Sequence, residues 1–572
     1  MCDVIIIGGM AAGCKAAARL SRLCPNYQIT IIEKSSFISF SCCGLPMYAS
    51  GEINDLSDLN KTSYGVIRDK KYFRQTKSTS VLTNTEVIKI DIDKKRIKCI
   101  DHEKEDEYEL TYDYLILATG SEPIKPSFPY PQSSLISSFH SPSDSKYFRE
   151  AAQKGEIEKA AVIGGGFIGC EIVEALTSLW GIETTLIEKE KSILCPILDR
   201  EISSFVLSHI PTGKVKLMVG TTVEKIEINE TGKPVIYLDY GEKLDFDFIF
   251  YCLGSKPNSK LAEKSGIEIG NQGGIVVNEQ MRTNIPYILA AGDCVEIKNL
   301  VTEKSDYFAL GSLSNRMGRV AADSIAGKCA RKDYVPFKGA VGTSSLKLFD
   351  DIICSSGLTE HKAKKLGYKT CSVVGSWYDR PDYNPETKNL LGKLVYEKTS
   401  HKLLGLQLVG EGEVTRYIDV FSELLSQNKK VEDLVNLEHA YTPFHSSPIS
   451  PLNNLGFMAI NQERDRIKNF NPLKLPYFNG TFIDVREIAE VVSFPFPEKS
   501  IQVPLSELHL IWNDFDLEQP IMFICERGPR SYEAARMFRN YGYKNVSYLG
   551  GGNLLYRSII QFSEYLETNH EQ

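Results

Sequence analysis

The sequence predicts an α/β protein with two Rossmann-like units, followed by an α+β domain and a small C-terminal α/β domain. Two observations carry this prediction. Residues 4–13 and 161–169 each have the pattern of a buried strand, a glycine turn and the start of a helix. In each copy a second strand then ends in an acid, Glu33 or Glu188, about 20 residues beyond the turn as dinucleotide-binding units require.

The later segments justify the remaining elements. Residues 114–120 and 248–254 close the two units with a strand ending in glycine, and residues 275–293 return to the first unit. Residues 333–455 alternate strand-like runs with a long helix, which is typical of an α+β domain. A polar stretch at 461–471 indicates a linker, and a further βα unit begins near residue 476.

Composition narrows the class of protein. The chain has 572 residues, which at roughly 100–200 residues per domain predicts three or four domains. The net charge of −7 argues against nucleic acid as the main partner. No apolar run approaches the ~18 residues of a spanning helix, and no secretory signal precedes the first strand. The 14 cysteines include no CxxC pair and no zinc spacing, so we expect no metal site, no membrane association and a reducing, cytoplasmic location.

The two glycine motifs predict two bound dinucleotides. Glycines let the backbone approach a pyrophosphate, the helix N-terminus stabilises its charge, and the acid accepts the ribose hydroxyls. Glu188 suits an unphosphorylated ribose, so NADH is expected rather than NADPH, although NADPH remains possible. Met10 departs from the pattern, because the first motif usually has its second glycine there. The alternative is a pair of structural units without ligands.

The order of these motifs resembles that of the flavoprotein disulfide reductases, which bind two dinucleotides. The resemblance implies an FAD-binding domain at 1–150 and 273–332, an NAD-binding domain at 151–272, and a dimerisation domain at 333–460. A homodimer is therefore expected. The FAD contacts that it implies are Gly8, Gly9, Ala12, Gly13, Glu33, Lys34, Val81, Ala118, Thr119, Gly120, Asp293 and Gly311. The implied NAD contacts are Gly164, Gly166, Phe167, Ile168, Gly169, Glu188 and Gly254.

Residues 39–46, Ser-Phe-Ser-Cys-Cys-Gly-Leu-Pro, resemble the single-cysteine branch of that family. This branch contains coenzyme A disulfide reductases, NADH peroxidases and NADH oxidases. The resemblance places Cys43 beside the flavin as the catalytic thiolate, where positive surroundings would lower its pKa. Cys42 stands where coenzyme A reductases usually have Asn, and it is expected to be structural. Without the resemblance, the whole Cys-Cys pair could equally be buried and structural.

Lys15, Arg19 and Arg22 form a basic stripe on the first helix, which could simply be a solvated face. The resemblance implies that this helix holds the nucleotide end of coenzyme A, as substrate or bound carrier. The coenzyme A contacts predicted in this way are Lys15, Arg19, Arg22, Ser39, Cys42 and Lys71.

Two tyrosines resemble those of the family's dimerisation domain. Tyr383 lies in an Asp-Tyr-Asn-Pro motif and Tyr441 in an Ala-Tyr-Thr-Pro motif. The resemblance implies that both reach the partner's active site, where their hydroxyls could donate protons to a departing sulfur. Ile449 departs from the pattern, since the family commonly has a coenzyme A-binding lysine there.

Residues 524–531, Ile-Cys-Glu-Arg-Gly-Pro-Arg-Ser, resemble a rhodanese active loop. The resemblance predicts a linker at 461–475 and a rhodanese-like domain at 476–572, with Cys525, Gly528, Arg530 and Ser531 in its loop. Backbone N–H groups of such a loop favour a thiolate or persulfide. Because the cysteine is retained, sulfurtransferase activity is expected rather than a docking module.

Together these features predict an NAD(P)H-dependent flavoprotein that reduces coenzyme A disulfide, coenzyme A persulfide or polysulfide. Two alternatives remain at this point. One is an NADH oxidase or peroxidase in which Cys43 cycles through a sulfenic acid. The other is a redox sensor that signals through its flavin.

Overall fold

The computed structural model describes residues 2–330, 335–465 and 467–570. The chain divides into two compact units. The first unit comprises Met1–Gly164, Ile168–Ile187 and Thr222–Ala340, and the second comprises Gly165–Phe167, Glu188–Thr221 and Val341–Gln572. The expected domain boundary between residues 332 and 333 lies outside the described residues. Within the described ranges, no helix has the length and apolarity needed to cross a bilayer.

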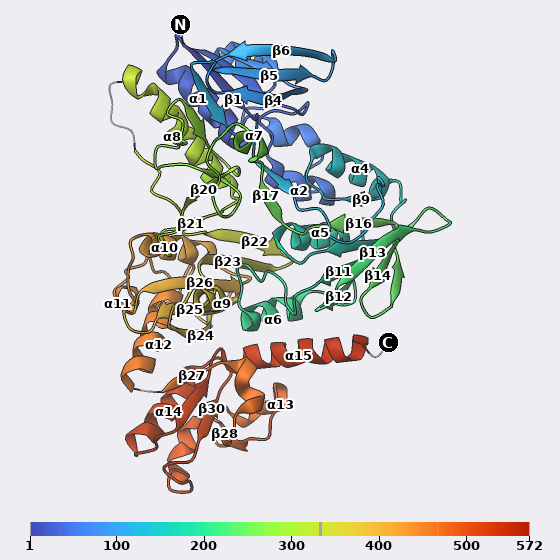
Figure 1. The fold of residues 1–572 in the computed structure, drawn as a ribbon. Helices are drawn as coiled ribbons and strands as arrows, with labels where there is room; N and C mark the ends of the chain where they lie inside the picture. Colours follow the sequence, from blue (N-terminus) through green and yellow to red (C-terminus); the bar gives the residue numbers. More distant parts are fainter. Residues whose placement is uncertain (1, 331–334, 466, 571–572) are drawn as a thin grey trace. The chain divides into compact units, whose positions relative to one another are not determined.

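The first glycine repeat builds a parallel sheet in the first unit (Figure 1). Its order is β19 (Ile288–Ala290), β7 (Tyr114–Leu117), β1 (Asp3–Ile7), β2 (Gln28–Ile32) and β3 (Thr79–Leu82). The central strands are runs of buried apolar residues. They share one hydrophobic core with helix residues such as Ala16 and Met317 and with Val87 and Ile97 of the antiparallel strands at 85–101. Helix α1 (Ala11–Leu23) packs on α8 (Gly311–Ala330), so the return segment supplies both β19 and α8, as the sequence predicts.

The second repeat forms the same βαβ arrangement. Strand β10 (Lys159–Ile163) leads into α5 (Phe167–Ser178), and β10 pairs in parallel with β11 (Glu183–Glu188) and β16 (Phe248–Tyr251), next to β9 (Ile136–Ser137). Smaller elements complete the first unit: α2 (Leu45–Ser50), α3 (Lys70–Lys77), β4 (Thr85–Asp91), β5 (Arg96–Asp101), β6 (Asp106–Thr111), β8 (Ser121–Pro123), α4 (Pro142–Gln153), β13 (Val223–Ile228), β14 (Pro234–Leu238), β15 (Lys243–Asp245), β17 (Ser255–Pro257), α7 (Lys260–Glu263), β18 (Ile275–Val276), β20 (Val295–Lys298) and β21 (Ser305–Asp306).

The second unit contains the predicted α+β domain. Its antiparallel sheet has the order β22 (Ser344–Leu348), β23 (Asp351–Gly357), β26 (Leu403–Gly410), β25 (Asn389–Glu397) and β24 (Thr370–Tyr378). Strands β25 and β26 are buried along almost their whole length. The same unit includes α6 (Arg200–His209), β12 (Val215–Val219), α9 (Glu360–Lys365), α10 (Thr415–Ser426), α11 (Val431–Val435) and α12 (Pro451–Asp465).

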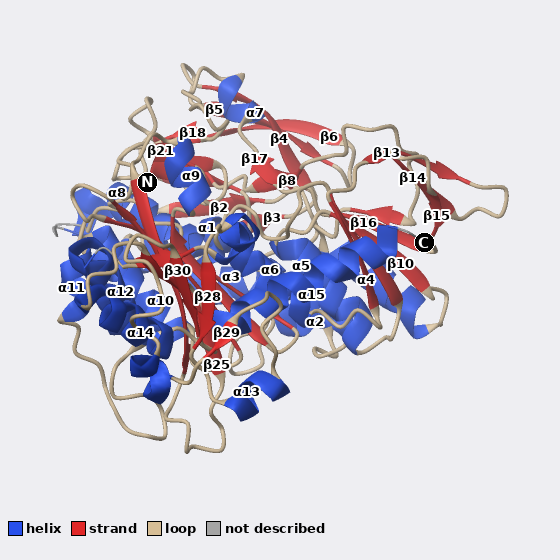
Figure 2. Cartoon of the chain, turned by 90° about the horizontal axis from the view of Figure 1, so that it is seen from below, coloured by secondary structure: helices blue, strands red, loops and turns tan. Residues whose placement is uncertain are grey.

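The C-terminal part of the second unit is a parallel sheet between helices (Figure 2). The order is β27 (Lys468–Phe470), β31 (Val546–Leu549), β30 (Ile521–Ile524), β28 (Thr481–Asp484) and β29 (Ile501–Gln502). Alternate residues of β30 point to opposite faces, so Phe523 packs with residues of α14 (Pro529–Asn540) and Met522 with α15 (Gly552–His570). Helix α13 (Ile488–Ser493) follows β28. The predicted fold class is confirmed.

The structure differs from the expected linker at 461–475. Residues 461–465 complete α12, β27 pairs with β31, and the 3-10 helix η3 (Pro472–Tyr477) follows. This segment is therefore not a coil: it starts the C-terminal sheet, and its polarity reflects a strand on the edge of that sheet.

Candidate active site

The first glycine turn leaves room for no side chain at two positions. Gly8 has φ +108°, and a Cβ there would overlap the carbonyl oxygen of Ala118. A Cβ on Gly13 would overlap the carbonyl oxygen of Gly8, so the start of α1 lies directly against the turn. Gly9 and Ala12 lie in the same turn and first helical residues. This close backbone approach is what a pyrophosphate-binding turn requires.

Glu33 lies at the end of β2, where the spacing predicts it. Its Oε2 accepts a hydrogen bond from the N–H of Gly9 at 2.7 Å, and its Oε1 accepts one from Ser35 at 2.9 Å. The carboxylate is therefore oriented toward the glycine turn. Lys34 follows it and is exposed, while Val81 lies on the neighbouring strand β3.

The closing motif is held by a residue that the sequence did not reveal. Thr119 Oγ1 donates to the carbonyl oxygen of Asn258 at 2.6 Å, and the Asn258 amide donates back to the Thr119 carbonyl at 3.0 Å. Asn258 also donates its backbone N–H to the Gly120 carbonyl oxygen at 2.9 Å. The Ala118-Thr119-Gly120 segment thus has a fixed conformation beside Gly8.

Cys43 lies in a one-turn 3-10 helix at Cys42–Gly44, just before α2. Its side chain is exposed, and a Cβ on Gly311, the first residue of α8, would lie 3.7 Å from the Cys43 Sγ. Asp293 belongs to the same surroundings, and its Oδ1 accepts a hydrogen bond from Ser314 of α8 at 2.6 Å. The structure thus places Cys43, Asp293 and Gly311 close to one another.

The electrostatics of Cys43 correct one expectation. Partial desolvation, the Glu171 carboxylate and the Asp293 carboxylate raise the pKa of the Cys43 thiol above its ordinary value. The protein's own groups therefore do not supply the positive surroundings that the sequence led us to expect. Partial desolvation and then Cys43 raise the pKa of Cys42 to about 11, while the Cys42 side chain is exposed.

Glu171 is the second residue that the sequence analysis missed. It lies on α5, and burial followed by Glu174 raises its pKa to about 7. Its position two residues beyond Gly169 was the available signal, because the helix after a glycine turn faces the same site.

The basic stripe on α1 is only partly free. Lys15 and Arg22 are exposed, but Arg19 forms an ion pair with Asp323 of α8 at 2.6 Å. Ser39 has φ +53° and receives a weak hydrogen bond of 3.4 Å from Arg68, a cation that the sequence analysis did not name. Lys71 is exposed on α3.

The second glycine turn repeats the geometry of the first. Gly164 has φ +106°, a Cβ there would overlap the Cys252 carbonyl oxygen, and a Cβ on Gly169 would overlap the Gly164 carbonyl oxygen. Phe167 and Ile168 start α5 after Gly166, and Gly254 has φ +95° at the closing motif.

The Glu188 carboxylate is oriented toward the second glycine turn, as the Glu33 carboxylate is oriented toward the first. Its Oε2 accepts the N–H of Gly165 at 2.6 Å, and its Oε1 accepts that of Glu190 at 2.8 Å. The two acids of the repeat are therefore equivalent in geometry as well as in sequence position.

The two tyrosine motifs lie next to each other in the second unit. Asn384 donates its side-chain amide to the Pro443 carbonyl oxygen at 2.9 Å, which joins the two loops. Tyr383 is 72% exposed and Tyr441 is 47% exposed. Desolvation and the nearby Tyr441 raise the pKa of Tyr383.

Cys525 ends β30 and faces the backbone of its own loop. The side chain is 1% exposed, and its Sγ accepts the N–H of Gly528 at 3.0 Å and lies 3.4 Å from the Ser531 Oγ. Gly528 has φ +124°, a conformation in which a side chain would be strained. One backbone N–H of the loop therefore donates to the sulfur, while the Ser531 hydroxyl donates to the Gly528 carbonyl oxygen at 2.8 Å.

Ion pairs brace this loop from outside. Arg530 forms a bidentate ion pair with Glu490 of α13, at 2.6 and 2.7 Å. The hydrogen bond from Arg530 is the main reason that the pKa of Glu490 is lowered to about 2. Glu526 accepts from the fully buried Arg486 at 3.0 Å and from Arg557 at 2.8 Å. The bracing residues Glu490, Glu526 and Arg557 were not predicted from the sequence.

The chemistry available is that of two cysteines: Cys43, which is exposed beside a helix start, and Cys525, which is buried and accepts the Gly528 N–H. Among the residues that the structure describes, no group of three or more His, Cys, Asp or Glu side chains is arranged to hold a metal ion.

Comparisons with known proteins agree with this architecture. The family described as pyridine nucleotide-disulphide oxidoreductase matches residues 2–314, its dimerisation domain matches residues 343–449, and the rhodanese-like domain matches residues 470–557. These matches, together with the relatives below, confirm the resemblance drawn from the sequence.

Three relatives are informative. The chain is 31% identical to an NAD(P)H sulfur oxidoreductase (CoA-dependent) of Pyrococcus abyssi, over 78% of this chain and 95% of the relative. It is 30% identical to an NADH oxidase of Methanocaldococcus jannaschii, over 78% of this chain and 96% of the relative. The solved structure of an NAD-dependent persulfide reductase from A. fulgidus has a TM-score of 0.91 and 35% identity, covering 97% of this chain and 100% of that one.

Proposed function

Because the chain belongs to the pyridine nucleotide-disulphide oxidoreductase family, we propose that it uses NADH to reduce coenzyme A persulfide, coenzyme A disulfide or polysulfide through Cys43. A sulfurtransferase activity at Cys525 accompanies this reductase. The enzyme is an NAD(P)H-dependent flavoprotein oxidoreductase, since family membership implies FAD and a nicotinamide nucleotide. A homodimer is part of the proposal, supported by the match to the family's dimerisation domain.

The residues present fit these cofactors. At Gly8 and Gly164 a Cβ would overlap neighbouring backbone atoms. Because both residues are glycines, the backbone of each turn can lie close to a pyrophosphate at the start of the following helix. Glu33 and Glu188 already point toward these turns and would accept ribose hydroxyls. When bound, the two cofactors supply a pair of electrons for each turnover.

The observation that carries the proposal is the position of Cys43, exposed in its 3-10 turn with Gly311 and Asp293 nearby. Its thiolate attacks a sulfur of the substrate and breaks the sulfur–sulfur bond. With a persulfide R–S–SH, attack on the inner sulfur gives a Cys43–S–S–R disulfide and releases HS⁻. Two electrons and one proton then restore the Cys43 thiolate and release R–SH. Attack on the outer sulfur instead releases the thiol and leaves a persulfide on Cys43.

The chain's own residues set the protonation of this step. Burial, Glu171 and Asp293 favour the neutral Cys43 thiol, so a proton must leave before attack. Glu171, with a pKa of about 7, exchanges protons readily near neutral pH and acts electrostatically on Cys43. The exposed Tyr383 and Tyr441 hydroxyls are the proposed proton donors to a departing sulfur across a dimer.

An NADH oxidase is the second candidate, because the relative from M. jannaschii carries that name. That relative and the sulfur oxidoreductase of Pyrococcus abyssi both match 78% of this chain, so coverage does not separate the two candidates. The rhodanese-like region does, because oxygen chemistry has no use for it. One experiment separates the two: steady-state NADH oxidation with coenzyme A disulfide, coenzyme A persulfide, polysulfide, peroxide and oxygen. We expect the sulfur substrates to give the highest kcat/KM, and a dominant oxygen rate would reject the proposal.

A further inference from the structure

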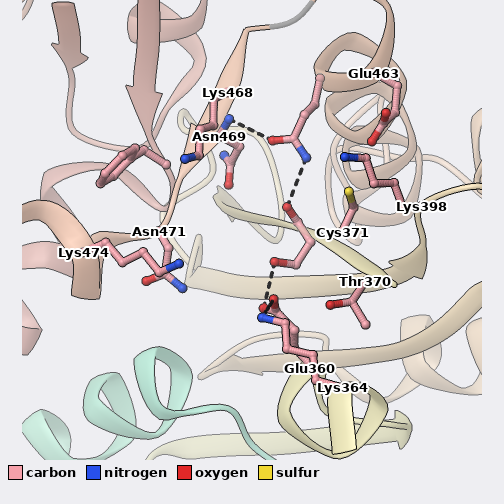
Figure 3. A pocket seen from close by; sticks show the side chains of 13 residues that line it. Glu360, Lys364, Thr370, Cys371, Lys398, Glu463, Lys468, Asn469, Asn471 and Lys474 are labelled. Carbon is pink, nitrogen blue, oxygen red and sulfur yellow. Dashed lines mark hydrogen bonds and ion pairs between the residues drawn. The ribbon is translucent and has the colours of Figure 1, made fainter. Parts of the chain in front are cut away.

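A cavity of about 500 Å³ lies within the second unit, where the dimerisation domain meets the first strand of the rhodanese-like domain (Figure 3). It contains none of the cysteine, glycine or tyrosine motifs described above. Its walls come from α9, the start of β24, the end of α12, β27 and η3. The lining residues that matter here are Glu360, Lys364, Thr370, Cys371, Lys398, Glu463, Lys468 and Lys474.

The cavity is basic in a protein whose net charge is −7. Four lysines line it against two glutamates, a local excess of two positive charges. Lys364 is ion-paired with Glu360. The ammonium groups of Lys398, Lys468 and Lys474 have no carboxylate of a described residue within 4.0 Å. Three cations therefore reach the cavity without a protein counter-ion.

The two glutamates are occupied by other groups. Although burial opposes it, Lys393 and Lys364 lower the pKa of Glu360 to about 2. Lys393 lies beneath the cavity, 2.8 Å from Glu360, and also contacts Glu201 at 2.6 Å and Asp199 at 3.1 Å. Glu463 accepts a hydrogen bond from the Tyr396 hydroxyl at 3.0 Å. Both carboxylates of the cavity are thus engaged by groups other than Lys398, Lys468 and Lys474.

One buried donor in the wall lacks a partner. The Thr370 hydroxyl oxygen is buried and makes no hydrogen bond to the described part of the protein, although buried polar atoms are normally satisfied. The amides in the wall are already committed, since Asn469 bonds Val374 and Asn471 bonds Glu201. The donors that remain at this site are the Thr370 hydroxyl and the ammonium groups of Lys398, Lys468 and Lys474. Of these, the Lys468 ammonium lies 4.9 Å from the centre of the Phe470 ring, an uncharged partner.

We propose that this cavity binds a small polyanion with adjacent phosphate groups, of about the size of a nucleoside diphosphate. The volume lies within the roughly 300–1,000 Å³ of small-molecule sites, and lysine is a strong point-charge partner for phosphate. Because Lys364 and Lys398 belong to the dimerisation domain while Lys468 and Lys474 come from the rhodanese side, the bound anion joins the two domains. This assignment is independent of the reaction at Cys43.

Cys371 provides a reporter that other nucleotide sites do not disturb. Its thiol lines the cavity next to Lys398 (Figure 3). Burial and Glu463 raise its pKa to about 11, and a neighbouring polyanion would raise it further. A bound anion should therefore slow alkylation of Cys371 both by covering the sulfur and by disfavouring its thiolate.

The test uses the full-length, FAD-loaded enzyme and inorganic pyrophosphate as the probe. Alkylation of Cys371 is followed by peptide mass spectrometry while pyrophosphate is raised. We expect the rate to fall about tenfold near ten times Kd, because protection follows 1 + [L]/Kd. The combined variant Lys398→Gln, Lys468→Gln, Lys474→Gln should lose this protection. Lys429→Gln, a matched control outside the cavity where the lysine pairs with Asp433, should keep it.

Three results would overturn the proposal. They are an alkylation rate independent of pyrophosphate, equal protection of the triple variant, and equal protection by sulfate at the same ionic strength. A parallel titration with ADP identifies the source of the phosphates. Tighter protection by ADP supports a nucleotide, and protection equal to that of pyrophosphate supports recognition of the phosphates alone.

Discussion

The guanidinium carbon of Arg527 lies 3.9 Å from the centre of the Tyr378 ring. Arg527 belongs to the loop of Cys525, whereas Tyr378 ends strand β24 of the dimerisation domain. The same arginine donates to Asn389 at 2.9 Å, and Ser376 donates to the Arg527 carbonyl oxygen at 3.3 Å. Within the second unit, the sulfur-binding loop is therefore attached to the neighbouring sheet by one of its own residues.

This attachment predicts that Tyr378→Leu loosens the loop. A cation–π contact of this kind contributes about 0.5–2 kcal/mol, and its loss should increase local opening. Hydrogen exchange of the amides of residues 526–528 and 530 should be about 2–30 times faster, since each 1.4 kcal/mol is a factor of ten. Tyr477→Leu is the control because Tyr477 is 86% exposed. Unchanged exchange in Tyr378→Leu would mean that the stacking contributes nothing to the loop.

Replacing the exposed cysteine tests the proposed nucleophile. In the Cys43→Ser variant, NADH should still bleach the bound flavin. The rate of disulfide and persulfide reduction should fall by several orders of magnitude, as it does in enzymes that lose a covalent nucleophile. Cys42→Ser is the matched control, because Cys42 is adjacent and its pKa is raised to about 11. Turnover that survives in Cys43→Ser and disappears in Cys42→Ser would reverse the assignment.

Glu171→Gln should make Cys43 more acidic. The Glu171 carboxylate raises the pKa of the thiol, so a neutral side chain removes that repulsion and the thiolate appears at lower pH. The midpoint of Cys43 alkylation against pH, measured by peptide mass spectrometry, should move downward. Exposed Glu158→Gln should leave it unchanged. An unchanged or higher midpoint in Glu171→Gln would show that the carboxylate does not act on this sulfur.

The choice of nicotinamide nucleotide should depend on Glu188. Its carboxylate, directed toward the second glycine turn by the Gly165 N–H at 2.6 Å, would repel a 2′-phosphate. We expect NADH to have the higher kcat/KM, and Glu188→Gln to reduce that preference about tenfold or more, because juxtaposed like charges cost several kcal/mol. A preference for NADPH in the unaltered enzyme would contradict this placement.

The sequence could predict the parts of the site that depend on local chain geometry. The glycine turns and the acids Glu33 and Glu188 follow from strand–turn–helix spacing alone. Asn258 could not be found this way, because it bonds Thr119 from 139 residues away. Strand β27 was also missed: it is three residues long, lacks alternation, and exists because it pairs with β31 far along the chain.

The charge of the protein groups around Cys43 differs from the expected one for a similar reason. Sequence motifs placed the thiol, but its charged neighbours come from α5 and from the strand end at Asp293, which only the folded chain brings together. Arg19 illustrates the same limit: its helical stripe is visible in the sequence, whereas its ion pair with Asp323 depends on the packing of α1 against α8.

The last prediction separates the proposed roles of Cys43 and Cys525. Cys525→Ser should abolish sulfur transfer from thiosulfate or a persulfide to a thiol acceptor, because the Gly528 N–H and its loop then face a hydroxyl instead of a nucleophilic sulfur. Reduction of coenzyme A disulfide should keep its kcat and KM, since that substrate needs only Cys43.

If Cys525 also delivers sulfur to Cys43, the rate of persulfide reduction should fall at low substrate concentration and recover at high substrate concentration, because a carrier raises effective concentration without changing the chemical step. Glu526 and Arg486, which contact each other beside the loop, are unchanged in this variant. Comparing the thermal unfolding of the variant with that of the unaltered enzyme checks that the fold is retained. Persulfide kinetics identical to those of the unaltered enzyme at every concentration would show that the two activities share a chain but not a reaction path.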